Sequence, residues 1–63
     1  MMQKKYDLLR HYGEIIADKE HETKDGNFIR FMTFKYKDSY YVATMFNGKV
    51  FMIAEKEDIR ELL

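Results

Sequence analysis

The sequence predicts an α+β fold in which an N-terminal helix precedes a four-stranded antiparallel β-meander and a short C-terminal helix. Apolar residues recur with a helical period at both ends of the chain and with a period of two between them. Three two-residue turn signals divide the middle stretch, namely Asp25-Gly26, Asp38-Ser39 and Asn47-Gly48. Because 63 residues leave room for one hydrophobic core, we expect a single domain over residues 1–63.

The first helix is expected over residues 1–12. Its apolar side chains fall on one side of a helix that turns by about 100° per residue. These side chains are Leu8, Met1, Tyr12, Leu9, Met2 and Tyr6. Gly13 follows, and glycine best tolerates the left-handed conformation that often comes after a helix end. We therefore expect the helix to stop there, with Gly13 in the left-handed region.

Four strands rich in Phe, Tyr, Ile, Val and Thr are expected over residues 14–23, 28–36, 40–46 and 49–54. If every connecting loop has two residues, the turn signals set the register of the whole sheet. The opposed pairs are then Thr23 with Phe28, Lys37 with Tyr40, and Phe46 with Lys49. Successive side chains of a strand point to opposite faces, so this register assigns each strand residue to a face.

The first face of the predicted sheet is mainly apolar and should be covered by the two helices. Its residues are Ile15, Ala17, Lys19, His21, Phe28, Arg30, Met32, Phe34, Tyr36, Tyr41, Ala43, Met45, Val50, Met52 and Ala54. The second helix is indicated by Ile59, Leu62 and Leu63 at helical spacing, with Glu57 and Asp58 in its first turn, where the helix dipole favours acids.

The second face of the predicted sheet is divided in character. The first strand gives it acidic side chains, Asp18, Glu20 and Glu22. The other strands give it an apolar patch made of Ile29, Phe31, Val42, Phe46, Phe51 and Ile53. An open face of an antiparallel sheet is normally polar, so this patch indicates that something covers it. We predict that these six residues form a partner-binding face, with all but Val42 as its anchors and with a polar rim of Lys35, Lys49, Glu20 and Glu22.

Composition excludes several classes of function. The chain has 11 basic and 11 acidic residues, no cysteine and one serine, Ser39. We therefore expect no thiolate metal site, no activated nucleophile and no cofactor, and a protein that is not an enzyme. Glu20 and Glu22 point away from His21 in a strand, so this triplet is no metal cluster. No secretory signal or membrane span is visible, and we expect a cytoplasmic protein that does not bind membranes.

The leading functional hypothesis is a small non-enzymatic protein-binding module that acts as a homodimer, or as an inhibitor or adaptor of a larger protein. Its short, cysteine-free composition, rich in Tyr, Lys and Glu, resembles that of small accessory proteins of phages and mobile elements. No motif accompanies that resemblance, so it implies no role for any residue.

Two alternatives remain open from the sequence. Interleaved aromatic and basic residues are typical of single-stranded nucleic-acid binding. The candidates are Arg30, Lys35, Tyr36, Lys37, Tyr40, Tyr41 and Lys49. The other alternative is a plain monomeric domain, in which the helices cover one face each or a three-residue loop shifts the register.

Overall fold

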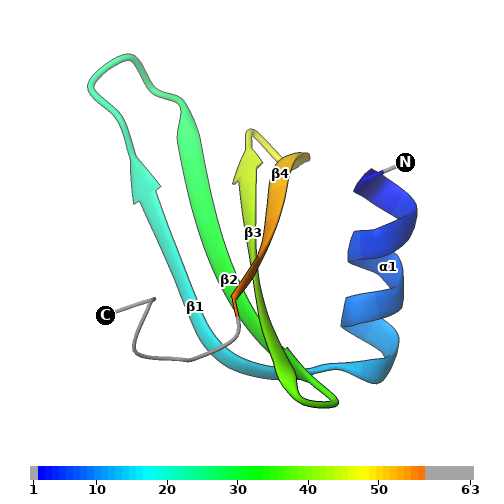
Figure 1. Ribbon diagram of the computed structural model, residues 1–63. Coiled ribbons are helices and arrows are strands. Elements are labelled where there is room, and N and C mark those ends of the chain that lie inside the picture. The colour runs from blue at the N-terminus through cyan, green and yellow to red at the C-terminus, as the bar shows by residue number, and fades with distance from the viewer. Residues whose placement is uncertain (1, 57–63) are drawn as a thin grey trace.

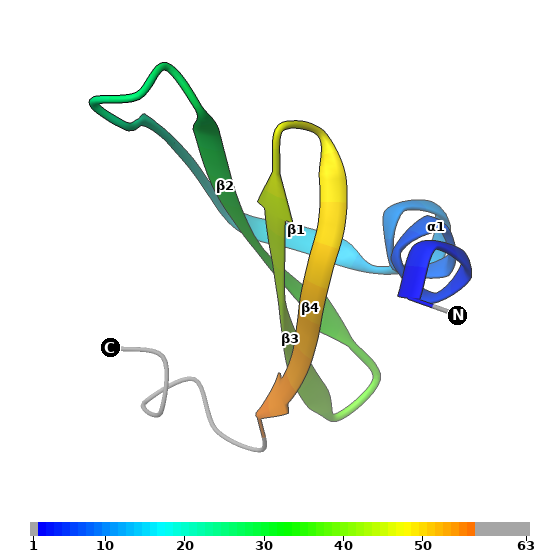
Figure 2. The same ribbon diagram turned by 90° about the horizontal axis from the view of Figure 1, so that it is seen from above.

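The computed structural model describes residues 2–56. It contains α1 (Met2–Tyr12), β1 (Glu14–Glu22), β2 (Phe28–Tyr36), β3 (Ser39–Phe46) and β4 (Lys49–Lys56). The strands form one antiparallel sheet in the order β1-β2-β3-β4, and α1 stands on one side of it (Figure 1 and Figure 2). The N-terminal helix and the meander are confirmed, whereas the predicted C-terminal helix lies outside the described residues.

The chain passes from α1 into β1 through a single residue, Gly13. Its amide N–H donates to the Leu9 carbonyl oxygen at 2.8 Å, which continues the helical hydrogen-bond ladder. The expected left-handed conformation is wrong, because only Gly26 and Gly48 among the glycines have positive φ. Glycine is needed at position 13 for another reason. A Cβ there would lie 2.7 Å from the Leu9 carbonyl oxygen, closer than carbon and oxygen can approach.

The core lies between α1 and the face of the sheet that α1 covers. Its buried side chains come from α1 and the two central strands: Leu9, Met32, Phe34, Ala43 and Met45. Five half-buried side chains surround them: Tyr6, Tyr36, Tyr41, Val50 and Ile53. The Tyr6 ring meets Phe34 edge-on, with the ring centroids 6.1 Å apart. This core is small, because α1 buries Leu9 alone among its described residues.

Thr23 and Asn27 close the turn between β1 and β2, which leaves a loop of three residues, 24–26. This loop overturns the predicted faces of β1. The Thr23 amide donates to the Asn27 carbonyl oxygen at 2.7 Å, and the Gly26 amide donates to the Thr23 carbonyl oxygen at 3.1 Å. Gly26 has a φ of 80°, as expected for a turn followed by one left-handed residue. Phe28 therefore pairs with Glu22 and not with Thr23.

This shift of the register by one residue places most side chains of β1 on the face opposite to the predicted one. Asp18, Glu20 and Glu22 lie on the side covered by α1, and Lys19 and His21 lie on the other side. The predicted faces of these residues are wrong, because a loop of three residues replaces the expected loop of two. A β-bulge between Ile15 and Ala17 then returns the start of β1 to the expected parity, so that Ile15 pairs with Phe34.

At the β2–β3 and β3–β4 turns, the strand residues next to each turn lie on the predicted faces of the sheet. The predicted Asp38-Ser39 turn is wrong, because the loop is Lys37-Asp38 and Tyr36 pairs with Ser39. The partner of Tyr36 thus differs by two positions from the expected Tyr41, so the faces of β2 and β3 are unchanged. The Asn47-Gly48 turn is confirmed, with φ values of 49° and 82° and with Phe46 opposite Lys49.

A second β-bulge, at Phe51, separates the Met45–Val50 and Thr44–Met52 pairs. Beyond it the parity of β4 is reversed, so that Ile53 pairs with Ala43 and packs against the core. The prediction that Ile53 lies on the partner-binding face is therefore wrong. Met52 and Ala54, which were predicted to be covered, lie on the opposite side instead.

Candidate binding face

The side of the sheet away from α1 has no covering layer among the described residues, and we call it the open face (Figure 2). Its centre is apolar or weakly polar across the last three strands. The register places there Ile29, Phe31, Thr33, Val42, Thr44, Phe46, Met52 and Ala54. The bulge residue Phe51 stands at its margin. Five of the six residues of the predicted apolar patch thus gather around the open face, and Ile53 is the exception.

A groove runs over the end of the open face nearest the β3–β4 turn. It has a volume of about 420 Å³ and is lined by Ile29, Phe31, Thr44, Met45, Phe46 and Phe51. Phe31, Phe46 and Phe51 are 41%, 44% and 68% exposed. Ile29 pairs with Phe46 and Phe31 with Thr44, so neighbouring strands bring these side chains together.

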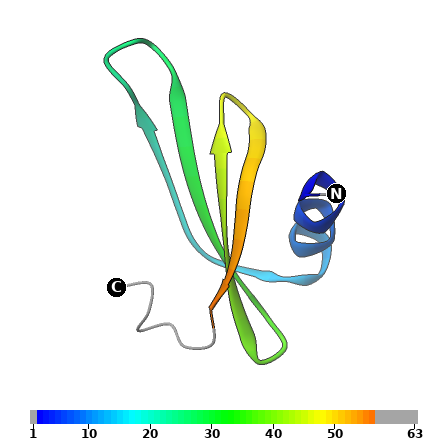
Figure 3. The same ribbon diagram turned by 45° about the horizontal axis from the view of Figure 1, so that its top comes forward.

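Two asparagines fix the backbone at this end of the groove. The Asn47 Oδ1 accepts a hydrogen bond from the Phe28 amide at 2.8 Å, and the Asn47 amide donates to the Phe28 carbonyl oxygen at 2.8 Å. The Asn47 Nδ2 donates to the Asn27 Oδ1 at 3.0 Å. These bonds tie the start of β2 to the β3–β4 turn. In Figure 3 the β1–β2 and β3–β4 hairpins point the same way.

The charges of the open face are mainly basic. Lys19 and His21 pair with Phe31 and Ile29, and Lys49 pairs with Phe46. Two more lysines, Lys35 and Lys56, share this face by register, and Glu14 opposite Lys35 is its acidic residue among those described. The predicted acidic rim of Glu20 and Glu22 is wrong, since both residues lie on the α1 side.

The residues predicted for nucleic-acid binding do not form one surface. Arg30, Tyr36 and Tyr41 lie on the α1 side, and Lys35, Tyr40 and Lys49 lie on the open face. Lys37 occupies the turn between β2 and β3. These candidate residues are therefore distributed over both faces of the sheet and do not present one surface to a nucleic-acid strand.

Arg30 is also engaged by an acidic residue of β1. Its Nε and Nη2 atoms donate to the Asp18 Oδ1 and Oδ2 at 2.9 Å and 2.6 Å, a bidentate ion pair. These hydrogen bonds, aided by the Arg30 charge, hold the pKa of the Asp18 carboxyl below its usual value. The pair joins β1 to β2 on the α1 side, where sequence reasoning had placed Arg30 but not Asp18.

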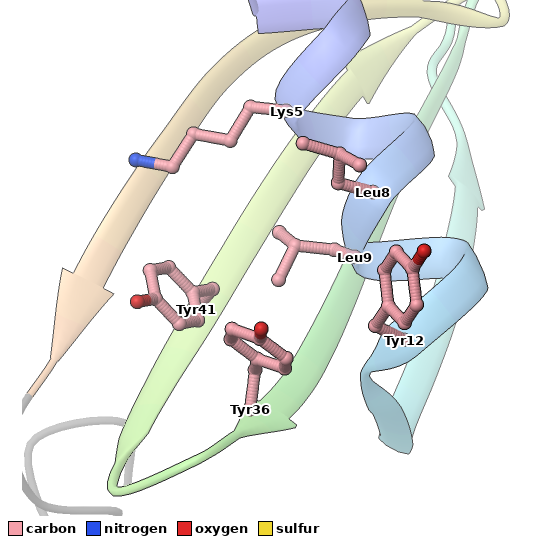
Figure 4. A pocket seen from close by; sticks show the side chains of 6 residues that line it. All are labelled: Lys5, Leu8, Leu9, Tyr12, Tyr36 and Tyr41. Carbon is pink, nitrogen blue, oxygen red and sulfur yellow. The ribbon is translucent and has the colours of Figure 1, made fainter.

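A second groove lies on the α1 side, between the helix and the β2–β3 end of the sheet (Figure 4). Its volume is about 230 Å³, and it is lined by Lys5, Leu8, Leu9, Tyr12, Tyr36 and Tyr41. The Lys5 Nζ lies 5.5 Å from the centroid of the Tyr41 ring. Sequence reasoning missed this groove because it assumed that the apolar arc of the helix is buried.

The described residues give little other material for a site. Residues 2–56 contain no group of three His, Asp or Glu side chains arranged to hold a metal ion. Within the same range no helix is long and apolar enough to cross a membrane. The described residues form an α+β fold with one helix against a four-stranded meander. No protein-family model, curated protein or solved structure matches the chain.

Proposed function

We propose that this chain is a non-enzymatic protein-binding module whose open face takes an acidic, amphipathic segment of a partner protein. One observation carries the proposal. Three exposed phenylalanines surround a groove on a sheet face whose charges are nearly all positive. The phenylalanines offer the apolar contact, and the lysines offer charge complementarity to an acidic partner.

The apolar contact can supply substantial affinity. Fully burying one large apolar side chain is worth about 1.5 to 3 kcal/mol, and aromatic residues at the centre of a patch tend to dominate binding energy. Phe51, at 68% exposed, has the most surface to bury and is the principal anchor in this proposal. Phe31 and Phe46 are the secondary anchors.

The charges favour a different protein over a second copy of the chain. A twofold dimer through the open face would oppose this face to itself, and it would set the lysines of one copy, such as Lys19, Lys35 and Lys49, against a face that carries the same lysines. Like charges across an interface are unfavourable. We therefore propose an inhibitor or adaptor role rather than a homodimer.

The test uses synthetic amphipathic peptides, in an acidic series and a charge-reversed basic series, followed by NMR and calorimetry. We expect the acidic series to bind and to shift the amide signals of residues 29–33 and 44–51. Phe51→Asp should weaken that binding at least tenfold. Phe28→Asp is the matched control, because Phe28 is 44% exposed but lies on the other side of the sheet. Equal binding of both series, or no effect of Phe51→Asp, would contradict the proposal.

Single-stranded nucleic acid is the second candidate, for one specific reason. The open face combines exposed phenylalanines with lysines, which is the pairing that stacks bases and neutralises phosphates. Binding of oligothymidylate should then fall steeply with salt and should weaken in Phe46→Ala and Lys49→Ala. The Tyr36→Ala variant, altered on the other side of the sheet, is the control. Absence of any binding at low salt would dismiss this candidate.

A further inference from the structure

We propose that the groove between α1 and the β2–β3 end of the sheet is the docking site of the chain's own residues 57–63. This proposal is independent of the function proposed for the open face. In this proposal the residues that follow β4 cover the apolar surface of α1 and add their side chains to the core.

The apolar side of α1 is largely exposed among the described residues. Leu9 is buried, but Met2, Leu8 and Tyr12 are 47%, 50% and 65% exposed. Leu8 and Tyr12 form the helix wall of the groove, and Tyr36 and Tyr41 form the sheet wall (Figure 4). Most of the lining is therefore hydrocarbon or aromatic ring, with Lys5 as the charged group at the side.

The path of the chain leads to this groove. Glu55 is the cross-strand partner of Tyr41, and Lys56 is the partner of Tyr40. The polypeptide thus leaves β4 beside one wall of the groove. The groove of the open face is at the far end of the strand, because Phe51 precedes Lys56 by five positions, about 16 Å at the rise of a strand. Seven residues span about 23 Å when extended and about 10 Å as a helix, so residues 57–63 reach the nearer groove in either form.

The chemistry of the segment matches the groove. Residues 57–63 contain three large aliphatic side chains, Ile59, Leu62 and Leu63, spaced to share one face of a helix. Their charged residues are Glu57, Asp58, Glu61 and Arg60, which leaves two net negative charges. Beside the groove, α1 presents Lys5, and Lys4 lies next to it on the surface formed with Met2 and Leu8. Residues 57–63 therefore match the groove both in apolar side chains and in opposite charge.

Attachment to β4 makes docking intramolecular. A short tether gives an effective concentration in the millimolar range, so a contact too weak to hold a free peptide can hold this segment. The segment would also remove Leu8 and Tyr12 from water, which the described residues do not do.

The decisive experiment is paramagnetic labelling of the full chain. The protein has no cysteine, so Glu61→Cys gives one attachment site for a nitroxide. We expect the label to broaden the signals of Leu8, Tyr12 and Tyr41 and to spare those of Phe31 and Phe46. A label at Lys24→Cys, in the distant β1–β2 loop, is the control and should leave Leu8 and Tyr12 unbroadened. Broadening on the open face, or on neither face, would overturn the proposal.

A double-mutant cycle gives an independent measurement of the same contact. We expect Leu8→Ala and Leu62→Ala each to raise the unfolding equilibrium constant. If the two side chains are in contact, the factor for the double variant should be at least threefold smaller than the product of the two single factors. The control cycle pairs Leu62→Ala with Phe46→Ala on the open face, and its effects should multiply. Multiplicative effects in the Leu8 cycle would overturn the proposal, whatever the open face binds.

Discussion

At the scale of single residues, backbone geometry restricts which side chain can stand at positions 13 and 37. Lys37 has a φ of 56°, in a region where a residue other than glycine or asparagine is strained. Gly13, in contrast, has no positive φ but no room for a Cβ. The sequence marked Gly13 as the end of the helix but for the wrong reason, and it did not mark Lys37, because a turn signal predicts where the chain reverses but not which residue takes the unusual φ.

Replacing Lys37 by Asn should stabilise the protein. Asparagine tolerates the left-handed region, where an ordinary residue costs roughly 1 to 2 kcal/mol. The Lys37 Nζ lies 5.3 Å from the Tyr36 ring, and loss of this exposed contact offsets part of the gain. We expect a net increase of about 0.5 to 1 kcal/mol in the free energy of unfolding, measured with urea. Lys35→Asn, in the regular part of β2, should give no increase; equal stabilisation would contradict this explanation.

Gly13→Ala should have the opposite effect. The new Cβ would meet the Leu9 carbonyl oxygen at 2.7 Å, and backbone atoms on both sides restrict any adjustment. We expect a loss of about 1 to 3 kcal/mol in thermal or urea unfolding, as for other overpacked sites. Gln3→Ala, on the exposed side of α1, is the control and should change stability by less than about 0.5 kcal/mol.

The Asp18–Arg30 pair should give the protein an acid-sensitive contribution to stability. Folding lowers the pKa of Asp18 from its ordinary value of 3.8, so the pair stabilises the fold above that pH. This contribution is lost as the pH falls through the lower pKa of the folded state. Both side chains are more than a third exposed, so we expect less than about 1 kcal/mol. In Asp18→Asn, stability measured between neutral and acidic pH should fall less than in the wild type. Asp25→Asn, in the β1–β2 loop, should leave the pH dependence unchanged.

At the scale of elements, two β-bulges and one loop decide which side chains face the core. The sequence predicted the helix, the four strands and the Asn47-Gly48 turn, since these depend on local period and turn chemistry. It did not predict the extra residues in β1 and β4, because a bulge leaves no clear signal in an alternating pattern. Ile53 is the clearest case. Its sequence parity put it on the same face as Phe31, but the bulge at Phe51 placed it opposite Ala43 on the α1 side.

This reversal predicts unequal costs for neighbouring substitutions in β4. Ile53 packs against the core, whereas Met52 is 49% exposed on the open face. Ile53→Ala should therefore lower the free energy of unfolding by about 2 kcal/mol or more. Met52→Ala should cost about 0.5 kcal/mol or less. Urea unfolding of the two variants measures the difference, and the reverse order would contradict the observed register.

At the scale of the whole molecule, the sheet separates two kinds of surface. Three of the four acids of β1, namely Asp18, Glu20 and Glu22, lie on the α1 side. The open face keeps four lysines and the exposed Phe31, Phe46 and Phe51. The sequence predicted an apolar, partner-binding face, and most of its anchors lie together. It did not predict the charge of that face, since one additional loop residue moved Glu20 and Glu22 to the other side.

The charge of the open face predicts how self-association depends on salt. At low salt, repulsion between the lysines should keep two open faces apart. At about 1 M salt the Debye length is roughly 3 Å, and the phenylalanines are then free to meet. We expect the mass measured by sedimentation to rise with salt in the wild type and to stay constant in Phe51→Asp. Phe28→Asp should behave as the wild type does, and a rise in Phe51→Asp would show that association uses another surface.

The two β-bulges have a consequence for how this protein can meet another chain. They lie in β1 and β4, which are the two edges of the sheet. An unbroken edge strand offers a ladder of free amides and carbonyls on which a foreign strand can add, and fibres grow in that way. Each edge of this sheet is interrupted by a residue that breaks the ladder. Strand addition is thereby discouraged at both margins, and recognition is directed to side chains on the faces.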